Sequence, residues 1–136
     1  MRLFKQPKVF LSGSLDSDWQ ERVERAIPEL EYFDPRSHRL NDAVKYAAWD
    51  MHHIRMADIL FGYMEKDNLS GYGLAIEIGY ARGLGKTIIL VDERSKVDVE
   101  FKEHFAIVRE LADVTLNSLD EGIALLKRFA HGAHDE

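Results

Sequence analysis

The sequence predicts a three-layer α/β fold, in which a parallel five-stranded sheet of flavodoxin-like order 2-1-3-4-5 carries helices on both faces. One observation behind this prediction is that short apolar runs alternate along the chain with longer segments of helical periodicity. Another is that several apolar runs, such as TIILVD, are continuous, which is typical of strands buried on both faces. At 136 residues, the chain is expected to form a single domain over residues 1–136.

Five segments have the length and composition of buried strands. The first ends in small residues that predict a tight turn, and the second is stopped by Pro35. The fourth is the richest in β-branched residues, which favour strands. The predicted strands cover residues 8–14, 30–35, 57–64, 86–93 and 112–118.

Five further segments, between and after the strands, are predicted to be helical. Asp16 or Ser17 is the expected N-cap of the first helix, because both side chains accept hydrogen bonds from backbone N–H groups. The third helix is opened by Ser70 and Gly71 and closed by two glycines. The predicted helices cover residues 16–27, a part of 41–56, 70–85, 97–111 and 119–130.

The composition narrows the classes of function. A formal net charge of -6 disfavours a protein that binds nucleic acid polymers, which requires a basic face. The absence of cysteine excludes disulfides, thiolate zinc sites and cysteine nucleophiles. No segment approaches the roughly 20 apolar residues of a membrane span, and the N-terminal residues lack the apolar stretch of a signal peptide. We therefore expect a cytoplasmic protein that acts on a small molecule, without a membrane and without a cofactor.

The predicted topology places a ligand site at one edge of the sheet. In an open parallel sheet, ligands bind beyond the carboxyl ends of the strands where the strand order reverses, here between the first and third strands. Four segments are expected at this crevice, namely 11–15, 33–39, 63–72 and the loop after Val91. The helix that contains Glu77 opens from the same crevice.

Glu77 is the strongest functional candidate, because its charge has no local partner. In a helix, its neighbours one turn away are Gly73, Leu74, Tyr80 and Ala81. None of these side chains pairs with a carboxylate. Burial of an unpaired carboxylate is costly or raises its pKa, and such groups are common at functional sites. The alternative is a structural carboxylate that caps a neighbouring backbone segment.

Other candidates lie near the expected crevice. Ser12 and Gly13 stand where the first strand meets a helix N-terminus, which suits an oxygen-rich ligand, although a plain tight turn explains them equally well. Asp34 and Arg36 end the second strand, where a surface salt bridge is the alternative. Asp50 lies at the edge of the apolar stripe of its helix, and an exposed helical aspartate is the ordinary interpretation.

Two tempting motifs are set aside. The run GYARGLGKT resembles a P-loop, but it is one residue too long and leads from a helix into a strand, whereas a phosphate loop leads from a strand into a helix. His52 and His53 are adjacent, so they lie on different faces of a helix and make a poor metal pair. We expect no metal site.

Four segments form a specific series along the chain. They are VFLSG followed by a tryptophan, FDPR, WDMHHIRMADILF and SGYGLAIEIGYARGLGKTIILV, within residues 9–91. The most specific part is an acidic residue seven positions before an Ala-Asp strand start, followed by EIGYA before the next strand. The series resembles the nucleoside 2-deoxyribosyltransferase superfamily, and in particular its short nucleoside 2-deoxyribosyltransferase-like branch.

This resemblance implies N-glycosidic chemistry on 2′-deoxynucleosides. Glu77 matches the family's nucleophilic glutamate, which would attack C1′ of the sugar and form a covalent glycosyl ester. Asp50 matches the aspartate that handles the proton of the departing or arriving base. Phe10 and Trp49 are expected walls of the base site, because aromatic faces stack on heterocycles.

The chain also departs from the family pattern. Gly71 stands where the transferases often carry an aspartate that binds sugar hydroxyls, and Phe10 stands where they often carry a tyrosine. We still expect Gly71 and Gly73, at the start of the helix, to lie against the substrate. The resemblance further implies a homodimer or a higher homo-oligomer, in which His104 is the candidate residue contributed by the neighbouring subunit.

Three activities stay open at this point. The first is deoxyribosyl transfer or nucleoside hydrolysis through Glu77. The second is N-glycosidic cleavage of nucleoside 5′-monophosphates, in which Ser12, Ser14 and Arg36 would serve the phosphate. Asp16 and Asp18 in the same loop disfavour a phosphate dianion. The third is a non-catalytic nucleotide-binding or sensing domain, in which Glu77 only hydrogen-bonds a sugar.

Overall fold

The sheet has the predicted strand order. The computed structural model describes residues 5–131, and its five strands are parallel and arranged β2-β1-β3-β4-β5. The flavodoxin-like topology is therefore confirmed, with the reversal of strand order between β1 and β3. The strands are β1 (Lys8–Gly13), β2 (Glu31–Phe33), β3 (Ile59–Met64), β4 (Thr87–Asp92) and β5 (Val114–Leu116).

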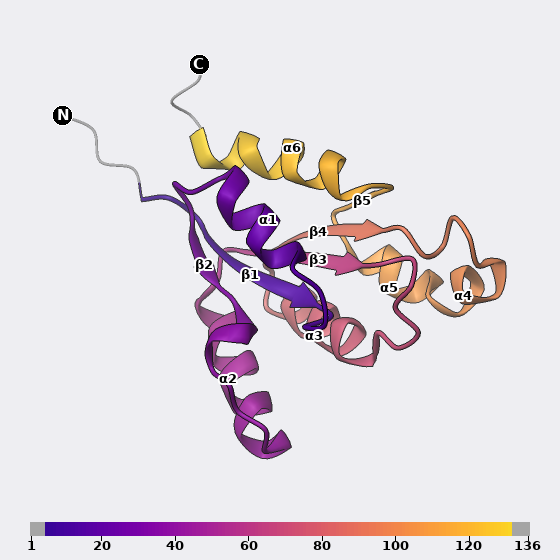
Figure 1. The fold of residues 1–136 in the computed structure, drawn as a ribbon, viewed down its shortest axis with the longest axis horizontal. Helices are drawn as coiled ribbons and strands as arrows, with labels where there is room; N and C mark the ends of the chain where they lie inside the picture. Colours follow the sequence, from indigo (N-terminus) through magenta and orange to yellow (C-terminus); the bar gives the residue numbers. More distant parts are fainter. Residues whose placement is uncertain (1–4, 132–136) are drawn as a thin grey trace.

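Helices cover both faces of the sheet, which confirms the predicted three layers (Figure 1). One face carries α1 (Trp19–Ala26) and α6 (Leu119–His131). The opposite face carries α2 (Ala43–Met56), α3 (Tyr72–Gly83) and α5 (Ala106–Leu111), with the short α4 (Val99–His104) farther out. A 3-10 turn, η1 (Pro35–Ser37), follows β2. Within residues 5–131, no helix has the length and apolar character needed to cross a membrane.

Two apolar cores form because the side chains of a strand point alternately to the two faces of the sheet. In β1, Val9 and Leu11 point into the core shared with α1 and α6. Phe10 points into the opposite core, which α2, α3 and α5 complete. By the same alternation, Ser12 points to the face of α2 and α3, so β1 delivers a fully buried hydroxyl to that side of the sheet.

The predicted helix over residues 97–111 is instead two short helices. The backbone of Phe105 leaves the helical region, with φ of -91° and ψ of 0°, and separates α4 from α5. This break allows Phe105, which is only 5% exposed, to enter the core and to stack on Phe101 with the ring centroids 4.6 Å apart. Packing of one aromatic residue thus overrides the continuous helical pattern.

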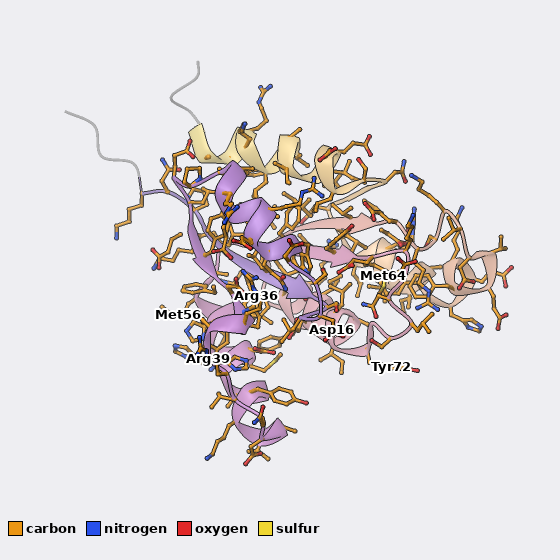
Figure 2. The ribbon with its side chains drawn as sticks, in the orientation of Figure 1. Asp16, Arg36, Arg39, Met56, Met64 and Tyr72 are labelled. Carbon is orange, nitrogen blue, oxygen red and sulfur yellow. The ribbon has the colours of Figure 1, made fainter. Side chains whose placement is uncertain are left out.

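Helix α1 begins at Trp19, later than either predicted cap. The hydroxyl of Ser17 is bound to Glu65 at 2.8 Å, and the backbone N–H of Asp16 donates to the hydroxyl of Ser14 at 3.1 Å. These contacts hold residues 14–18 as a loop at the carboxyl end of β1, where Figure 2 labels Asp16. Asp18 is the N-cap, without a side-chain hydrogen bond to the helix.

Candidate active site

A cavity of about 310 Å³ opens at the carboxyl end of β1, where the strand order reverses. Small-molecule sites typically measure about 300–1,000 Å³, so the cavity has room for one small ligand. It lies among β1, the loop after β2, and helices α2 and α3. Its lining residues are Gly13, Leu15, Pro35, His38, Leu40, Tyr46, Asp50, Gly73, Leu74 and Glu77.

Glu77 lies on the face of α3 that meets the sheet, and only 9% of the residue is exposed. The hydroxyl of Ser12 donates a hydrogen bond to Oε1 of Glu77 at 2.5 Å. Burial raises the pKa of Glu77 to about 8, the hydrogen bond from Ser12 acts to lower it, and the nearby Asp50 acts to raise it. The carboxyl group that lacks a partner within its own helix therefore finds one on β1.

Ser12 and Gly13 are placed by the geometry of β1. Ser12 pairs with Gly62 of β3 in the middle of the sheet, and its side chain is fully buried against α3. At Gly13 a side chain does not fit, because a Cβ atom there would lie 2.6 Å from the carbonyl oxygen of Tyr63. The backbone of Gly13 therefore packs closely on that of Tyr63. Gly13 is also one of the residues that line the cavity.

Asp50 reaches the same cavity from α2. Burial raises the pKa of Asp50, while its hydrogen bond with the carboxyl group of Glu77 acts to lower it. Two carboxyl groups this close in a poorly hydrated site do not both ionise readily, so the pair holds one proton at intermediate pH. Oδ1 of Asp50 is buried and has no hydrogen-bond partner within residues 5–131, which leaves it available to a bound molecule.

His38 is a cavity residue that the sequence interpretation did not single out. The backbone N–H of Leu40 donates to its Nδ1 at 2.8 Å, so a neutral ring carries its hydrogen on Nε2. Nε2 lies 3.8 Å from Oδ1 of Asp50, and the side chain of His38 is only 7% exposed. Between His38 and Leu40, Arg39 takes a φ of 54°, which makes the tight turn possible. The only signal in the sequence is its place within the 33–39 segment expected at the crevice.

Phe10 and Trp49 stand behind the cavity. Phe10 is fully buried in the core between the sheet and α2, and neither residue is among those that line the cavity. Trp49 contacts the ring of His38 edge-on, with the centroids 4.9 Å apart, and stacks on His53 at 3.8 Å. The two aromatic residues expected as walls of a base site thus support the residues in front of them.

Asp34 and Arg36 pair with each other at the end of β2. The guanidinium of Arg36 donates to Asp34, with Nη2 2.7 Å from Oδ2, and also lies 3.5 Å from Glu24. The Asp34 side chain accepts the backbone N–H of Arg36 at 3.0 Å and so caps η1. Neither residue is among those that line the cavity, and Figure 2 shows Arg36 beside the end of β2. Asp34 and Arg36 thus form a salt bridge with each other, which is the alternative to a role in ligand binding.

The glycines at the start of α3 differ in placement. Gly73 lines the cavity, whereas Gly71 does not. Gly71 caps α3 with a φ of 108°, and a Cβ atom there would collide with the side chain of Met64. An aspartate at this position would therefore be strained. His104 also lies outside the cavity, with 78% of its side chain exposed, and its role in a neighbouring subunit stays a prediction.

The cavity offers two carboxyl groups that share a proton, one of them held by a serine hydroxyl. Such a pair suits a reaction in which one carboxylate attacks a carbon atom while the other carboxyl group donates a proton. Within residues 5–131, no group of three or more histidine, aspartate or glutamate side chains is placed to hold a metal ion. Two carboxyl groups and a serine hydroxyl can supply acid–base and nucleophilic chemistry.

The sequence profile of a family described as “Nucleoside 2-deoxyribosyltransferase like” matches residues 6–95. The matched segment contains Ser12, Asp50 and Glu77. Among curated proteins, no sequence gives a significant match to the chain.

Two solved structures resemble the fold. A 2-deoxyribosyltransferase from Leishmania mexicana has a TM-score of 0.69 and 18% sequence identity, over 90% of this chain and 97% of that chain. A CMP N-glycosidase from Clostridium botulinum has a TM-score of 0.62 and 20% identity, over 88% of this chain and 97% of that chain. At these identities the likeness concerns the fold alone.

Proposed function

Because the chain belongs to the nucleoside 2-deoxyribosyltransferase-like family, we propose that it breaks the N-glycosidic bond of 2′-deoxynucleosides and transfers the deoxyribosyl group to water or to another base. The observation that carries this proposal is the pair of carboxyl groups, Glu77 and Asp50, at one cavity of small-molecule size. The cavity lies in the matched part of the chain, at the edge of the sheet where this type of fold binds ligands.

In the first step, the Glu77 oxygen that Ser12 does not hold attacks C1′ of the sugar. A C1′–O bond forms while the C1′–N bond breaks, and the electron pair of that bond leaves with the base. Asp50 donates its proton to the departing base nitrogen, which is worth about 10²–10⁴ in rate for a general acid. The products of this step are the free base and a deoxyribosyl ester of Glu77.

In the second step, water or a second base attacks C1′ from the face that the first base has left. The ester bond to Glu77 breaks, and Asp50 accepts the proton of the attacking group. Two displacements at one carbon retain its configuration. A 2′-deoxy sugar suits this route, because no 2′-hydroxyl withdraws electrons from the positive charge that develops at C1′.

The assigned roles require one particular protonation state of the pair. Attack by Glu77 requires a carboxylate, and donation by Asp50 requires a carboxylic acid, so the reactive form is the pair with one proton. Burial and the interaction with Asp50 raise the pKa of Glu77 to about 8. Burial also raises the pKa of Asp50, whereas the hydrogen bond with Glu77 and the nearby His38 and His53 act to lower it. The singly protonated pair therefore exists around neutral pH, and the interaction within the pair favours the proton on Glu77. The hydrogen bond from Ser12 acts in the opposite direction, toward the reactive microstate in which Glu77 is ionised and Asp50 holds the proton.

The lining of the cavity favours an uncharged nucleoside over a nucleoside 5′-monophosphate. None of the described residues that line it is a lysine or an arginine. Arg36, the basic residue that the sequence offered for a phosphate, is paired with Asp34 and lies near Glu24. A phosphate dianion would thus meet two carboxyl groups without a lining cation. Cleavage of monophosphates is the second candidate activity, and a non-catalytic nucleotide-binding domain is the third.

The test is a panel of 2′-deoxynucleosides and their 5′-monophosphates, incubated with and without an acceptor base and analysed for released and exchanged bases. The wild type is expected to release base from nucleosides, and Glu77→Gln, which keeps the shape of the side chain, is expected not to. Release only from monophosphates would replace the first candidate by the second. If no substrate is cleaved while a nucleotide raises the melting temperature, the protein is a binding domain.

We also propose a homo-oligomeric state, in which His104 approaches the cavity of a neighbouring subunit. Its position on the exposed α4, outside the cavity of its own chain, is compatible with such a role. Light scattering gives the oligomer size. Mixing His104→Ala with inactive Glu77→Gln chains then tests whether one subunit completes the site of another.

A further inference from the structure

We infer that the side chains of His38 and Tyr46 form an aromatic slot that binds the planar base of the substrate. Both residues line the cavity that contains Asp50 and Glu77. This inference rests on the N-glycosidic function proposed above and specifies where that function holds its leaving group. It differs from the sequence expectation, which placed Phe10 and Trp49 at the base.

The spacing of the two rings suits a planar ligand. The imidazole of His38 and the phenol of Tyr46 are parallel to within 4°, and their centroids are 6.5 Å apart. Stacked nucleobases lie about 3.4 Å apart, so a base with a ring on each face needs about 6.8 Å between those rings. The centroid separation of 6.5 Å is the largest value that the gap between these parallel rings can have, so a base enters between them when Tyr46 moves outward.

His38 is the fixed wall of the slot. Its Nδ1 accepts the backbone N–H of Leu40 at 2.8 Å, which determines the orientation of the ring. Trp49 packs edge-on against it, with an interplanar angle of 65°, so the ring is held from behind as well. With only 7% of the side chain exposed, His38 has little freedom to turn away from a ligand.

Tyr46 is the adjustable wall. It lies in the first turn of α2, and 41% of the residue is exposed, so it contributes little to the core. An aromatic ring with this exposure beside a cavity gains buried apolar surface when a flat ligand covers it. The partial exposure also permits the outward movement that a base between the two rings requires.

The slot leads to the proposed proton donor. Tyr46 and Asp50 are four residues apart on α2, which places them on the same face of the helix one turn apart. Nε2 of His38 lies 3.8 Å from Oδ1 of Asp50, so both walls adjoin this carboxyl group. A base held between the rings would present its edge to Asp50, with the sugar toward Gly73 and Glu77. The ligand class is therefore a planar, uncharged heteroaromatic base, either a purine or a pyrimidine.

The test measures binding separately from catalysis. The fluorescent nucleoside 2-aminopurine 2′-deoxyriboside is titrated into a Glu77→Gln background, which holds the ligand without turnover, and its quenching gives the Kd. Replacement of the ring by Tyr46→Leu is expected to raise the Kd by about 5- to 150-fold, as loss of a base–aromatic stack does. Tyr46→Phe keeps the ring and is expected to keep the Kd. Tyr72→Leu is the matched control, because Tyr72 is 80% exposed at the start of α3 and points away from the fold (Figure 2).

Two outcomes overturn the slot. One is a Kd for Tyr46→Leu equal to that of the Tyr72→Leu control, and the other is no binding of the probe at all. Base release by the wild type is measured in parallel, so the two proposals fail separately. Release together with an unchanged Kd for Tyr46→Leu rejects the slot and leaves the function standing. A raised Kd without release supports the slot and rejects the catalytic function.

Discussion

The hydroxyl of Ser12 and the carboxyl group of Glu77 meet at 2.5 Å, and this hydrogen bond joins β1 to α3 across 65 positions of the chain. A serine in an apolar strand and a glutamate in an apolar helix each look misplaced when taken alone. In the fold, the hydroxyl and the carboxyl group are hydrogen-bond partners, so burial leaves neither of them unpaired. The contact also fixes the position of Oε1, one of the two carboxyl oxygens of Glu77.

Ser12→Ala is expected to lower kcat/KM for base release by about 10- to 100-fold, because a hydrogen bond to a charged group contributes about 1.5–3 kcal/mol. The bond lowers the pKa of Glu77, so its loss should also move the high-pH limb of the rate profile to higher pH. The measurement is a pH–rate profile of the variant and the wild type.

The matched control for that variant is Ser14→Ala. Ser14 lies two residues farther along, and its hydroxyl accepts the backbone N–H of Asp16 and does not contact Glu77. The Ser14→Ala variant should therefore leave the high-pH limb of the rate profile at the same pH as in the wild type. Equal shifts in the two variants would show that Ser12 acts through the loop and not through Glu77.

Asp50→Asn is expected to lower the rate by about 10²–10⁴ for ordinary bases, because it removes the proton donor. The loss should be much smaller for a nucleoside whose leaving group departs as a stable anion, since that group needs no proton. The measurement compares kcat for the two substrates in both proteins. A loss of the same size for both substrates contradicts the role of Asp50 in proton transfer.

Glu77→Gln is expected to stabilise the protein at high pH. The pKa of Glu77 rises from 4.5 to about 8 on folding, so the stability that its protonated form contributes is complete below about pH 4.5 and is lost as the pH rises through about 8. Each pKa unit of this difference corresponds to about 1.4 kcal/mol. Urea unfolding at about pH 5 and about pH 8 should therefore show a growing advantage of the variant. An advantage that is the same at both pH values rejects the raised pKa.

Gly71→Ala is expected to destabilise the fold by about 1–3 kcal/mol, because the position has a φ of 108° and a Cβ atom there meets Met64. The matched control is Gly79→Ala in the middle of α3, where a Cβ atom meets nothing within 4 Å. That change should be neutral or stabilising by about 1 kcal/mol. Thermal unfolding of the two variants measures the difference. Equal melting temperatures would show that a side chain at position 71 causes no strain.

The features that the sequence predicts well are those that depend on local pattern. Continuous apolar runs identify β3 and β4, and their alternation with helical segments indicates a parallel sheet covered on both faces. Glu77 stands out because its own helix offers it no partner. The burial of that carboxyl group and the edge of the sheet at which it lies follow from the same pattern.

The features that the sequence does not predict depend on contacts between distant segments. The orientation of His38 is set by a turn at Arg39 and by the packing of Trp49 behind it. Phe10 is withdrawn from the cavity because the alternation of β1 directs its ring into the core. The break at Phe105 has the same origin, since it arises from packing and not from a helix-breaking residue.

If Glu77 is the nucleophile, its deoxyribosyl ester can be trapped on the protein. A 2′-fluoro-2′-deoxyarabinosyl nucleoside slows the second displacement, because its fluorine destabilises the positive charge that develops at C1′. After incubation and acid quench, peptide mass spectrometry locates the sugar on the protein. We expect one added fluorodeoxyarabinosyl group, on the peptide that contains Glu77, and no such group in Glu77→Gln. A label on another residue, or base release by Glu77→Gln at the rate of the wild type, would contradict it.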